Sequence, residues 1–299
     1  MGLNLNKLNM IQRAASLLLL LVVVFVFEAV HATEITSRAF NVVDFGAVGD
    51  GKTDLTKAIM SAWTEACNST EGRPRLLIPQ GTFFVGPVTF KGPCKGPMVV
   101  QLQGVLKASP NLADYDSDNW VVFKYIDGLV ITGGGTFDGQ GVSAWPHNHI
   151  TAPGDNPNTD GIHISNSYDI SIARLVIATG DDCVSLGSGR VNISISNVVC
   201  GPATVSMSGA SGTRDFTFED IVMKDVYNLI IIDQHYCPYA KCNNKSVPCK
   251  NIELSDIDLT YNGVREDATE AVTAICLNVN GISSGKQNPP SILICSMLI

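Results

Sequence analysis

Short runs of alternating apolar and polar residues recur along most of the chain. Four of them lie 23, 23 and 36 residues apart, namely Ile170–Ile172, Ile193–Ile195, Phe216–Phe218 and Ile252–Leu254. Alternation with a period of two predicts β-strands, and their regular recurrence predicts one coil of a solenoid for each interval. The longest interval is expected to contain an extra loop at Gln234–Pro248. We therefore predict an all-β fold, a parallel β-helix.

The first half of the chain carries further strand-like runs, which Gly and Pro separate. They are Leu76–Pro79, Thr82–Val85, Met98–Leu106, Trp120–Lys124 and Leu129–Thr132. Before these runs, Phe40–Ile59 indicates a strand, a Gly-rich turn and a helix of roughly Leu55–Cys67. The start of this helix is expected near Thr53 or Asp54, both of which are common capping residues.

The Gly-rich turn also has the spacing of a phosphate-binding loop. Gly46–Thr53 reads GAVGDGKT, which matches the GxxxxGKT pattern of such loops. The chain is acidic, however, with a formal net charge of −8, and its strand pattern is that of a solenoid. These features argue against a nucleotide site in the turn.

Composition agrees with one β-rich domain. The chain has 299 residues, 45% of them hydrophobic, which is enough to bury a sizeable core. Only 16% of residues are charged and 27 are glycines, a balance that suits stacked short strands better than long helices. The negative net charge argues against nucleic acid as a partner, and a negatively charged substrate would need local cations.

Residues 1–32 have the pattern of a secretory signal peptide. A positively charged start is followed by the apolar run Ala14–Phe27, and small residues predict cleavage after Ala32. The fourteen apolar residues fall short of the ~20 that a membrane-spanning helix needs. We expect a secreted chain in which residues 33–299 form the β-helix domain.

Nine cysteines fit an oxidising compartment and leave at least one unpaired. Cys183 and Cys200 are expected on neighbouring coils, which makes them the leading disulfide candidates. Weaker candidates are the pairs Cys67–Cys94 and Cys237–Cys242, and the lack of a CxxC pair argues against zinc. Three N-x-S/T sequons also agree with the secretory pathway: Asn68, Asn192 and Asn244.

Three aspartates are the candidate functional centre. Asp160 precedes one strand-like run, and Asp181 and Asp182 precede another 22 residues later. If 22 residues make one coil, these carboxylates lie on adjacent rungs, which are roughly 4.8 Å apart. Carboxylates so close repel one another, so such a cluster usually holds a metal ion, shares a proton or carries out acid and base catalysis.

The motifs around these aspartates resemble those of the plant polygalacturonases. NTDG at Asn158–Gly161 and GDDC at Gly180–Cys183 occur in the order and near the spacing of that family. The resemblance implies a right-handed parallel β-helix that hydrolyses pectin. The segment from Phe40 resembles the family's N-terminal motif, and this implies that the helix after it caps the open end of the solenoid.

The resemblance also implies a mechanism, which is inverting hydrolysis of α-1,4-linked galacturonan. Asp181 is then the general acid that protonates the leaving oxygen, while Asp160 and Asp182 hold and deprotonate the attacking water. Asn158 is expected to bind sugar hydroxyls or to orient Asp160. No metal or cofactor is implied, and the expected partner is the pectic polysaccharide polygalacturonate. We expect a monomer in the cell wall, with no membrane contact after signal removal.

Two family motifs are missing from the chain. One is a Gly-His-Gly on the coil after the aspartates, and the other is an Arg-x-Lys pair that grips the galacturonate carboxylate. About two coils are missing between Trp145 and His149–Asp155, and a second shortening follows Cys200. His163 is expected to be a packed or surface strand residue.

These departures leave other hypotheses open. One is a non-catalytic β-helix that binds pectin, and a less favoured one is a calcium-dependent pectate lyase that uses the aspartates as ligands. The gaps would also fit an incomplete gene model.

Overall fold

The computed structural model describes one compact unit that begins at Arg38, together with Ser37 before it. The described residues are 37–115, 119–140, 160–179, 182–187, 189, 191–201, 204–208, 214–224, 230–233, 249–260 and 279–288. The predicted signal peptide, the extra loop expected at Gln234–Pro248 and the candidate disulfide Cys237–Cys242 lie outside these residues. Among the described residues, no helix is long and apolar enough to cross a membrane.

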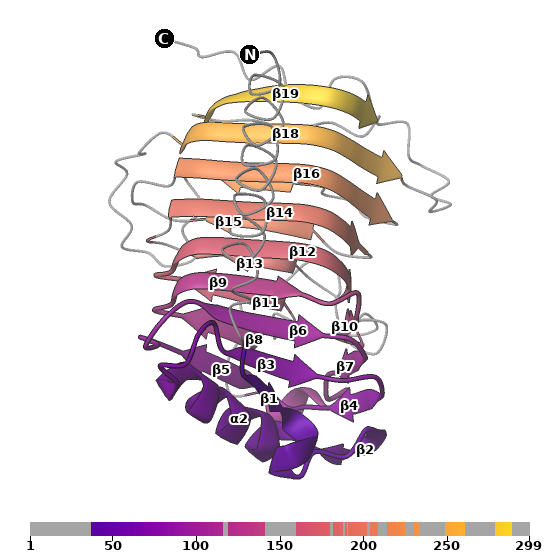
Figure 1. The fold of residues 1–299 in the computed structure, drawn as a ribbon. Coiled ribbons are helices and arrows are strands. Elements are labelled where there is room, and N and C mark those ends of the chain that lie inside the picture. The colour runs from indigo at the N-terminus through magenta and orange to yellow at the C-terminus, as the bar shows by residue number, and fades with distance from the viewer. Residues whose placement is uncertain are drawn as a thin grey trace, which may run out of the picture. The chain divides into compact units, whose positions relative to one another are not determined.

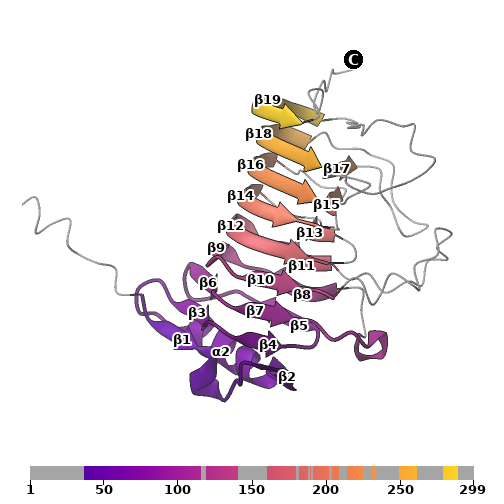
Figure 2. The ribbon, with the colours of Figure 1, turned by 90° about the vertical axis from the view of Figure 1, so that its right-hand side faces the viewer.

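The strands of this unit form two parallel sheets that wind around a common core (Figures 1 and 2). The smaller sheet has six strands, each hydrogen-bonded to the next along the stack. They are β5 (Val88–Lys91), β8 (Asn119–Lys124), β11 (Asp160–Ser165), β13 (Asp182–Leu186), β15 (Thr204–Ser208) and β17 (Ile230–Asp233). The fold is the all-β, right-handed parallel β-helix that the resemblance implied.

The larger sheet contains thirteen strands, and it bends around a second side of the stack. Nine of them form its main row, namely β1 (Ala39–Asn41), β3 (Arg75–Ile78), β6 (Met98–Leu102), β9 (Asp127–Thr132), β12 (Tyr168–Ala178), β14 (Val191–Cys200), β16 (Arg214–Lys224), β18 (Cys249–Thr260) and β19 (Val279–Asn288). Four shorter strands join it through β12, namely β2 (Asp50–Asp54), β4 (Thr82–Phe84), β7 (Val105–Lys107) and β10 (Thr136–Asp138). Residue Arg174, with φ 55°, turns β12 from one row to the other.

The coil period predicted from the sequence is confirmed by the register of these strands. Ile170 pairs with Ile193, Ile193 with Phe216, and Phe216 with Ile252, at the predicted intervals. All four side chains are buried, so each rung adds one apolar residue to a continuous internal stack.

One predicted strand, Met98–Leu106, is wrong because the structure divides it. β6 ends at Leu102 and β7 begins at Val105, with Gln103 and Gly104 between them. At Gly104 the chain turns a corner so close to the previous coil that an added Cβ would lie 2.3 Å from the carbonyl oxygen of Gly81. An apolar run can therefore cover two sides of a coil when a glycine permits the corner.

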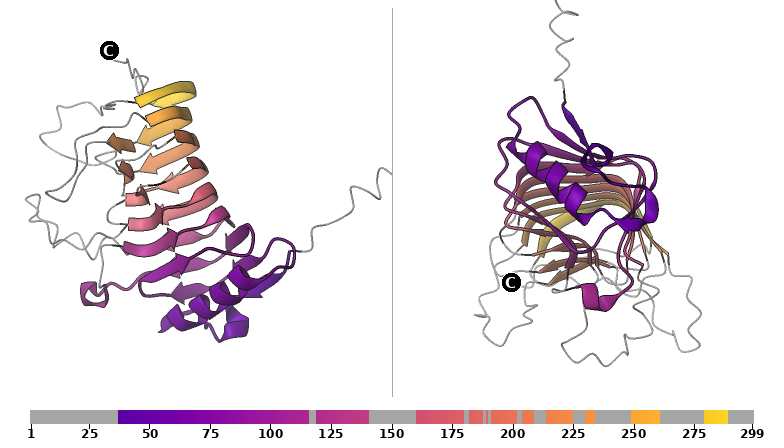
Figure 3. Two further views of the ribbon diagram at one scale, coloured as in Figure 1. Left: turned by 90° about the vertical axis from the view of Figure 1, so that its left-hand side faces the viewer. Right: turned by 90° about the horizontal axis from the view of Figure 1, so that it is seen from below.

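Helix α2 (Thr56–Asn68) covers the N-terminal end of the stack (Figure 3). It starts one residue later than expected, and the carboxylate of Asp54 accepts a 2.8 Å hydrogen bond from the backbone N–H of Thr56. The helix packs against β1, β3 and β5. Its buried residues are Ile59, Ala62, Trp63, Ala66 and Cys67. The helix thus shields the core that the first coil would otherwise expose.

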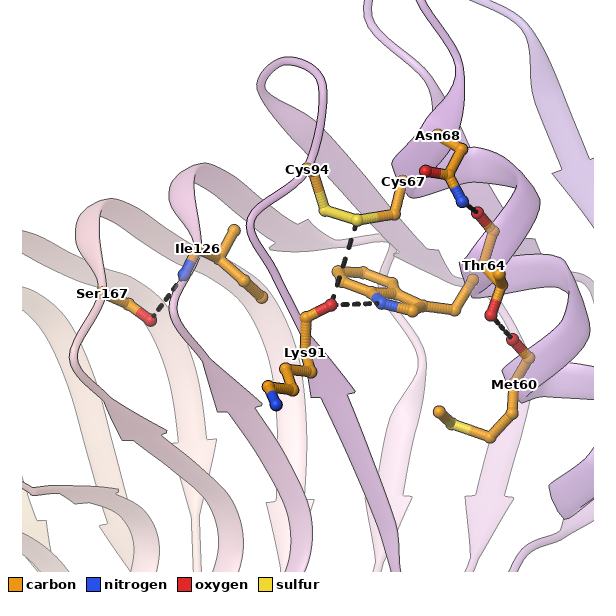
Figure 4. Close-up of a disulfide and its surroundings, with 9 residues drawn as sticks. Met60, Thr64, Cys67, Asn68, Lys91, Cys94, Ile126 and Ser167 are labelled. Carbon is orange, nitrogen blue, oxygen red and sulfur yellow. Dashed lines mark hydrogen bonds between the residues drawn. A yellow bond between two sulfur atoms is a disulfide. The ribbon is translucent and has the colours of Figure 1, made fainter.

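A disulfide (Figure 4) and an aromatic stack fasten this helix to the coils. Cys67 at its end is bonded to Cys94, which follows β5. Trp63 donates a 3.3 Å hydrogen bond from Nε1 to the carbonyl oxygen of Lys91. Its ring lies 4.9 Å from that of Phe90, which stacks at 4.9 Å on Phe123 of the next coil. The disulfide and the aromatic contacts therefore connect α2 to β5 and β8 of the smaller sheet.

The Gly-rich segment before α2 was predicted as a turn, but its residues 50–54 form strand β2, and the segment does not form a phosphate-binding loop. The carboxylate of Asp50 accepts 2.8 Å hydrogen bonds from the backbone N–H groups of Lys52 and Thr53, and a 2.7 Å bond from the Thr53 hydroxyl. These bonds, with the Thr53 N–H first, lower the pKa of Asp50 to about 2. A phosphate-binding loop needs those N–H groups for its ligand, whereas here the chain's own carboxylate takes them.

Candidate active site

Two of the three predicted aspartates begin neighbouring strands of the smaller sheet. Asp160 is the first residue of β11 and Asp182 the first of β13. In the next residues along, Ile162 pairs with Val184 and Ile164 with Leu186, which is an offset of 22. The same offset, continued back to the strand starts, sets Asp160 opposite Asp182. The coil length of 22 residues predicted from the aspartates is therefore the offset between these two strands.

Polar residues also begin the strands on either side of this pair. Asp160 pairs with Asn119 at the start of β8, and Asp182 pairs with Thr204 at the start of β15. Four consecutive strands of the smaller sheet thus begin with an asparagine, two aspartates and a threonine. Sequence reasoning missed Asn119 and Thr204, because no motif marks them.

Both carboxylates are largely withdrawn from solvent. Asp160 is 1% exposed and Asp182 is 9% exposed. A buried carboxylate is stable only with polar partners, and Asp160 has one in His163, whose Nδ1 lies 3.8 Å from Oδ2. The hydroxyl of Thr179, also buried, donates a 3.3 Å hydrogen bond to the backbone oxygen of Asp182. Asp181 and Asn158 lie outside the described residues.

The apolar side of the site is held by a disulfide and a close backbone approach. Cys183, next to Asp182, is bonded to Cys200 at the end of β14, which is the pair expected from the coil spacing. Gly161, next to Asp160, approaches this rung so closely that a Cβ would lie 2.8 Å from the Cys183 oxygen and 2.7 Å from Ile177 Cγ2. The glycine of NTDG is therefore needed for packing beneath the carboxylates.

His163 belongs to the site, although sequence reasoning placed it among packed or surface residues. Its Nδ1 lies 3.2 Å from Oγ of Ser185 and 3.8 Å from Oδ2 of Asp160. His163 and Ser185 are paired across β11 and β13. The signal that could have found Ser185 is the same offset of 22 residues that links the aspartates.

The described part of the chain does not suggest a metal centre. In it, no group of three or more His, Cys, Asp or Glu side chains is arranged to hold a metal ion. What the site does bring together is two buried carboxylates, an imidazole and a hydroxyl. Such groups can accept, donate and hold protons in acid–base catalysis.

Comparison with known proteins decides the family. The model of glycosyl hydrolases family 28 matches residues 67–151, 146–215 and 203–286. The chain belongs to this family. An exopolygalacturonase of Platanus acerifolia is 32% identical over 374 residues, with 85% of this chain and 97% of that protein covered. A polygalacturonase of Gossypium hirsutum is 30% identical over 380 residues, with 87% and 92% covered.

Solved structures show the same fold. The crystal structure of a hyperthermoactive exopolygalacturonase from Thermotoga maritima superposes with a TM-score of 0.50 at 18% sequence identity. The match covers 76% of this chain and 69% of that one.

The family 28 chain described here is shorter than its plant relatives. Its alignment with the Platanus protein runs over 374 positions, more than the 299 residues that the chain contains, so the relative has segments that this chain lacks. The family model matches in three pieces that meet near residues 146–151 and 203–215. These are the two places where the sequence indicated missing coils.

Proposed function

We propose that the chain hydrolyses α-1,4-linked galacturonan of pectin with inversion of configuration. The observation that carries this proposal is the 22-residue register between β11 and β13, which aligns Asp160 with Asp182 at one edge of the sheet. Family membership and the polygalacturonase names of the plant relatives support the substrate class.

In this proposal the carboxylates divide the work of inversion. Asp181 protonates the leaving glycosidic oxygen, and Asp160 and Asp182 orient a water and remove its proton. Inverting enzymes keep acid and base about 6.5–9.5 Å apart, so that the water fits between base and sugar. Neighbouring rungs roughly 4.8 Å apart, with side chains that extend outward, are compatible with this separation. Asn158 binds a sugar hydroxyl or orients Asp160.

We further propose that the protein works outside the cell. Residues 1–32 direct secretion and are removed after Ala32, and residues 33–299 act as a monomer on cell-wall polygalacturonate without a cofactor. The two disulfides of the described region support an oxidising compartment, since such bonds are rare in the cytosol.

The test is the release of reducing ends from polygalacturonate by the purified secreted chain. Asp181→Asn and Asp182→Asn are expected to lower the rate by a factor on the order of 10²–10⁴, the usual contribution of a positioned acid or base. The matched control is Asp220→Asn, which makes the same chemical change at an exposed residue of β16. Asp220 has φ 52°, a conformation that Asn also adopts readily, so the control should retain full activity.

Equal rates in Asp182→Asn and the wild type would contradict the assignment of the carboxylates. An unsaturated product that absorbs in the ultraviolet and disappears with a chelator would indicate a calcium-dependent lyase instead.

A second candidate is a β-helix that binds pectin without cutting it. The observation that favours it is the shortness of the chain, because the plant relatives contain segments that it lacks. The sequence also lacks the Gly-His-Gly and Arg-x-Lys motifs. Retardation of the folded protein in a gel that contains polygalacturonate, with no release of reducing ends, would support this function.

A further inference from the structure

The ring of His163 lies between the candidate site and a glycine. Nδ1 is near Asp160 and Ser185, and Nε2 is near Gly187. His163 is in the middle of β11, and its side chain is 21% exposed. Its two strand neighbours, Ile162 and Ile164, are fully buried. The imidazole therefore stands on the outer face of the sheet, on the same strand as Asp160.

The contacts of the ring define how it is held. Nδ1 is 3.2 Å from the hydroxyl oxygen of Ser185, which is 8% exposed, and 3.8 Å from Oδ2 of Asp160. A carboxylate beside Nδ1 favours a proton on that nitrogen, because the N–H dipole then points at negative charge. In the neutral ring, Nδ1–H then donates to Ser185, and Nε2 carries a lone pair that can accept a hydrogen bond.

The other side of the ring faces space that a glycine keeps clear. A Cβ built on Gly187 would lie 3.1 Å from Nε2 and 3.3 Å from Cε1 of His163. Gly187 is fixed in the rung by a 3.0 Å hydrogen bond from its N–H to the carbonyl oxygen of Ile164. Any side chain at position 187 would therefore crowd Nε2, and the glycine avoids this contact.

We propose that Nε2 of His163 binds a hydroxyl group of the sugar whose bond is cut. The ring is anchored through Ser185, oriented by Asp160 and kept open by Gly187, so that a bound sugar lies beside the carboxylates. His163 is thus a substrate-positioning residue. This inference rests on the proposed galacturonan substrate and adds one binding contact to it.

The experiment measures binding of a galacturonan oligosaccharide by calorimetry, in the Asp181→Asn background where hydrolysis does not interfere. His163→Leu is expected to weaken binding about tenfold, the effect of one lost hydrogen bond. His163→Gln should recover part of the loss, because its amide oxygen can accept the same hydroxyl proton. Ser185→Ala should also weaken binding, since it frees the ring to rotate.

Gly187→Ala provides the sharpest variant, because it changes no polar group. Its methyl group should displace the ring by a few tenths of an ångström and weaken binding, as His163→Leu does. The matched control is Gly96→Ala, because a Cβ there meets nothing within 4 Å and its backbone is not strained. In an active enzyme the Gly187→Ala change should raise KM and leave kcat nearly unchanged.

A spectroscopic readout separates the binding contact from a merely structural role. The ¹⁵N resonances of the neutral ring should show a protonated Nδ1 and an unprotonated Nε2, and oligosaccharide should shift the Nε2 signal. Unchanged affinity in His163→Leu and Gly187→Ala, with an unmoved Nε2 signal, would overturn the inference. Binding that depends on His163 in a chain that releases no reducing ends would uphold the contact between His163 and the sugar and refute the proposed hydrolysis.

Discussion

The side-chain amide of Asn192 donates a hydrogen bond of 2.6 Å to the carboxylate of Asp169, one coil earlier. Two coils further on, Asn251 makes the same bond of 2.8 Å to Asp215. The four residues occupy equivalent positions in β12, β14, β16 and β18, and all have φ between 53° and 62°. Asp and Asn alternate along this ladder, so Asp169 has one amide neighbour and Asp215 lies between two.

Asn192→Asp should destabilise the protein by about 1 kcal/mol, because it sets a new carboxylate between Asp169 and Asp215. Urea unfolding of unglycosylated protein measures the effect, which should shrink in high salt as charges are screened. Asn192→Gly is the control, since it keeps the positive φ and adds no charge. Its smaller cost should not depend on salt. Equal salt dependence in both variants would argue against charge repulsion.

Gly161→Ala should destabilise the fold by roughly 2–3 kcal/mol, the cost of overpacking a tight core. The new methyl group would press on the Cys183 oxygen and on side-chain atoms of Ile177 and Thr179. Thermal unfolding measures the loss, and Gly96→Ala, where the space is open, should be nearly neutral. If both variants unfold at the same temperature, the close approach at Gly161 does not limit stability.

The pair Cys67–Cys94 closes a loop with a sequence separation of 27 residues. Replacement of both residues by Ala should lower the free energy of unfolding by about 3 kcal/mol, because the unfolded chain gains freedom. Tryptophan fluorescence in urea follows the change. A reductant should reduce the difference in unfolding free energy between wild type and variant, because it breaks the same disulfide in the wild type. A variant as stable as the oxidised wild type would contradict the estimate.

Trp120→Phe tests the core between the two sheets. The indole is 1% exposed, and its Nε1 donates a 3.1 Å hydrogen bond to the carbonyl oxygen of Val85. We expect a loss of about 2–3 kcal/mol, from a cavity and an unpaired carbonyl. Phe137→Leu, which removes the ring that packs against Trp120, should cost less because the hydrogen bond remains. Chemical unfolding of both variants checks this order.

Asp50 should show a pKa of about 2 in a carbon-detected NMR titration, below its ordinary 3.8. The folded pKa is the lower one, so this carboxylate stabilises the fold above about pH 4, and the contribution is lost as pH falls toward 2. Thr53→Val removes the hydroxyl donor and should raise the pKa part of the way, because both backbone N–H donors stay. An unchanged pKa in that variant would show that the hydroxyl contributes nothing.

Much of the fold was predictable because local pattern and coil period carry it. The intervals that separate Ile170, Ile193, Phe216 and Ile252 gave both the strands and their register, since a buried rung needs an apolar residue in each coil. Helix α2 was predicted to within one residue at each end, although its N-cap residue is Leu55 and not Thr53 or Asp54. The short strands β5 and β10 were missed, because three or four residues carry too little alternation to be distinguished from a turn.

The sequence by itself determined the coil period, and with it the pairing of β11 with β13, because residues one period apart must meet in a solenoid. Only the tertiary structure decided that Asp50 occupies the N–H groups of a phosphate-loop-like turn, and that Gly104 breaks a strand. It also decided that Gly187 leaves His163 open. These features depend on the direction of side chains and on how closely neighbouring coils approach at glycines, which a one-dimensional pattern does not encode.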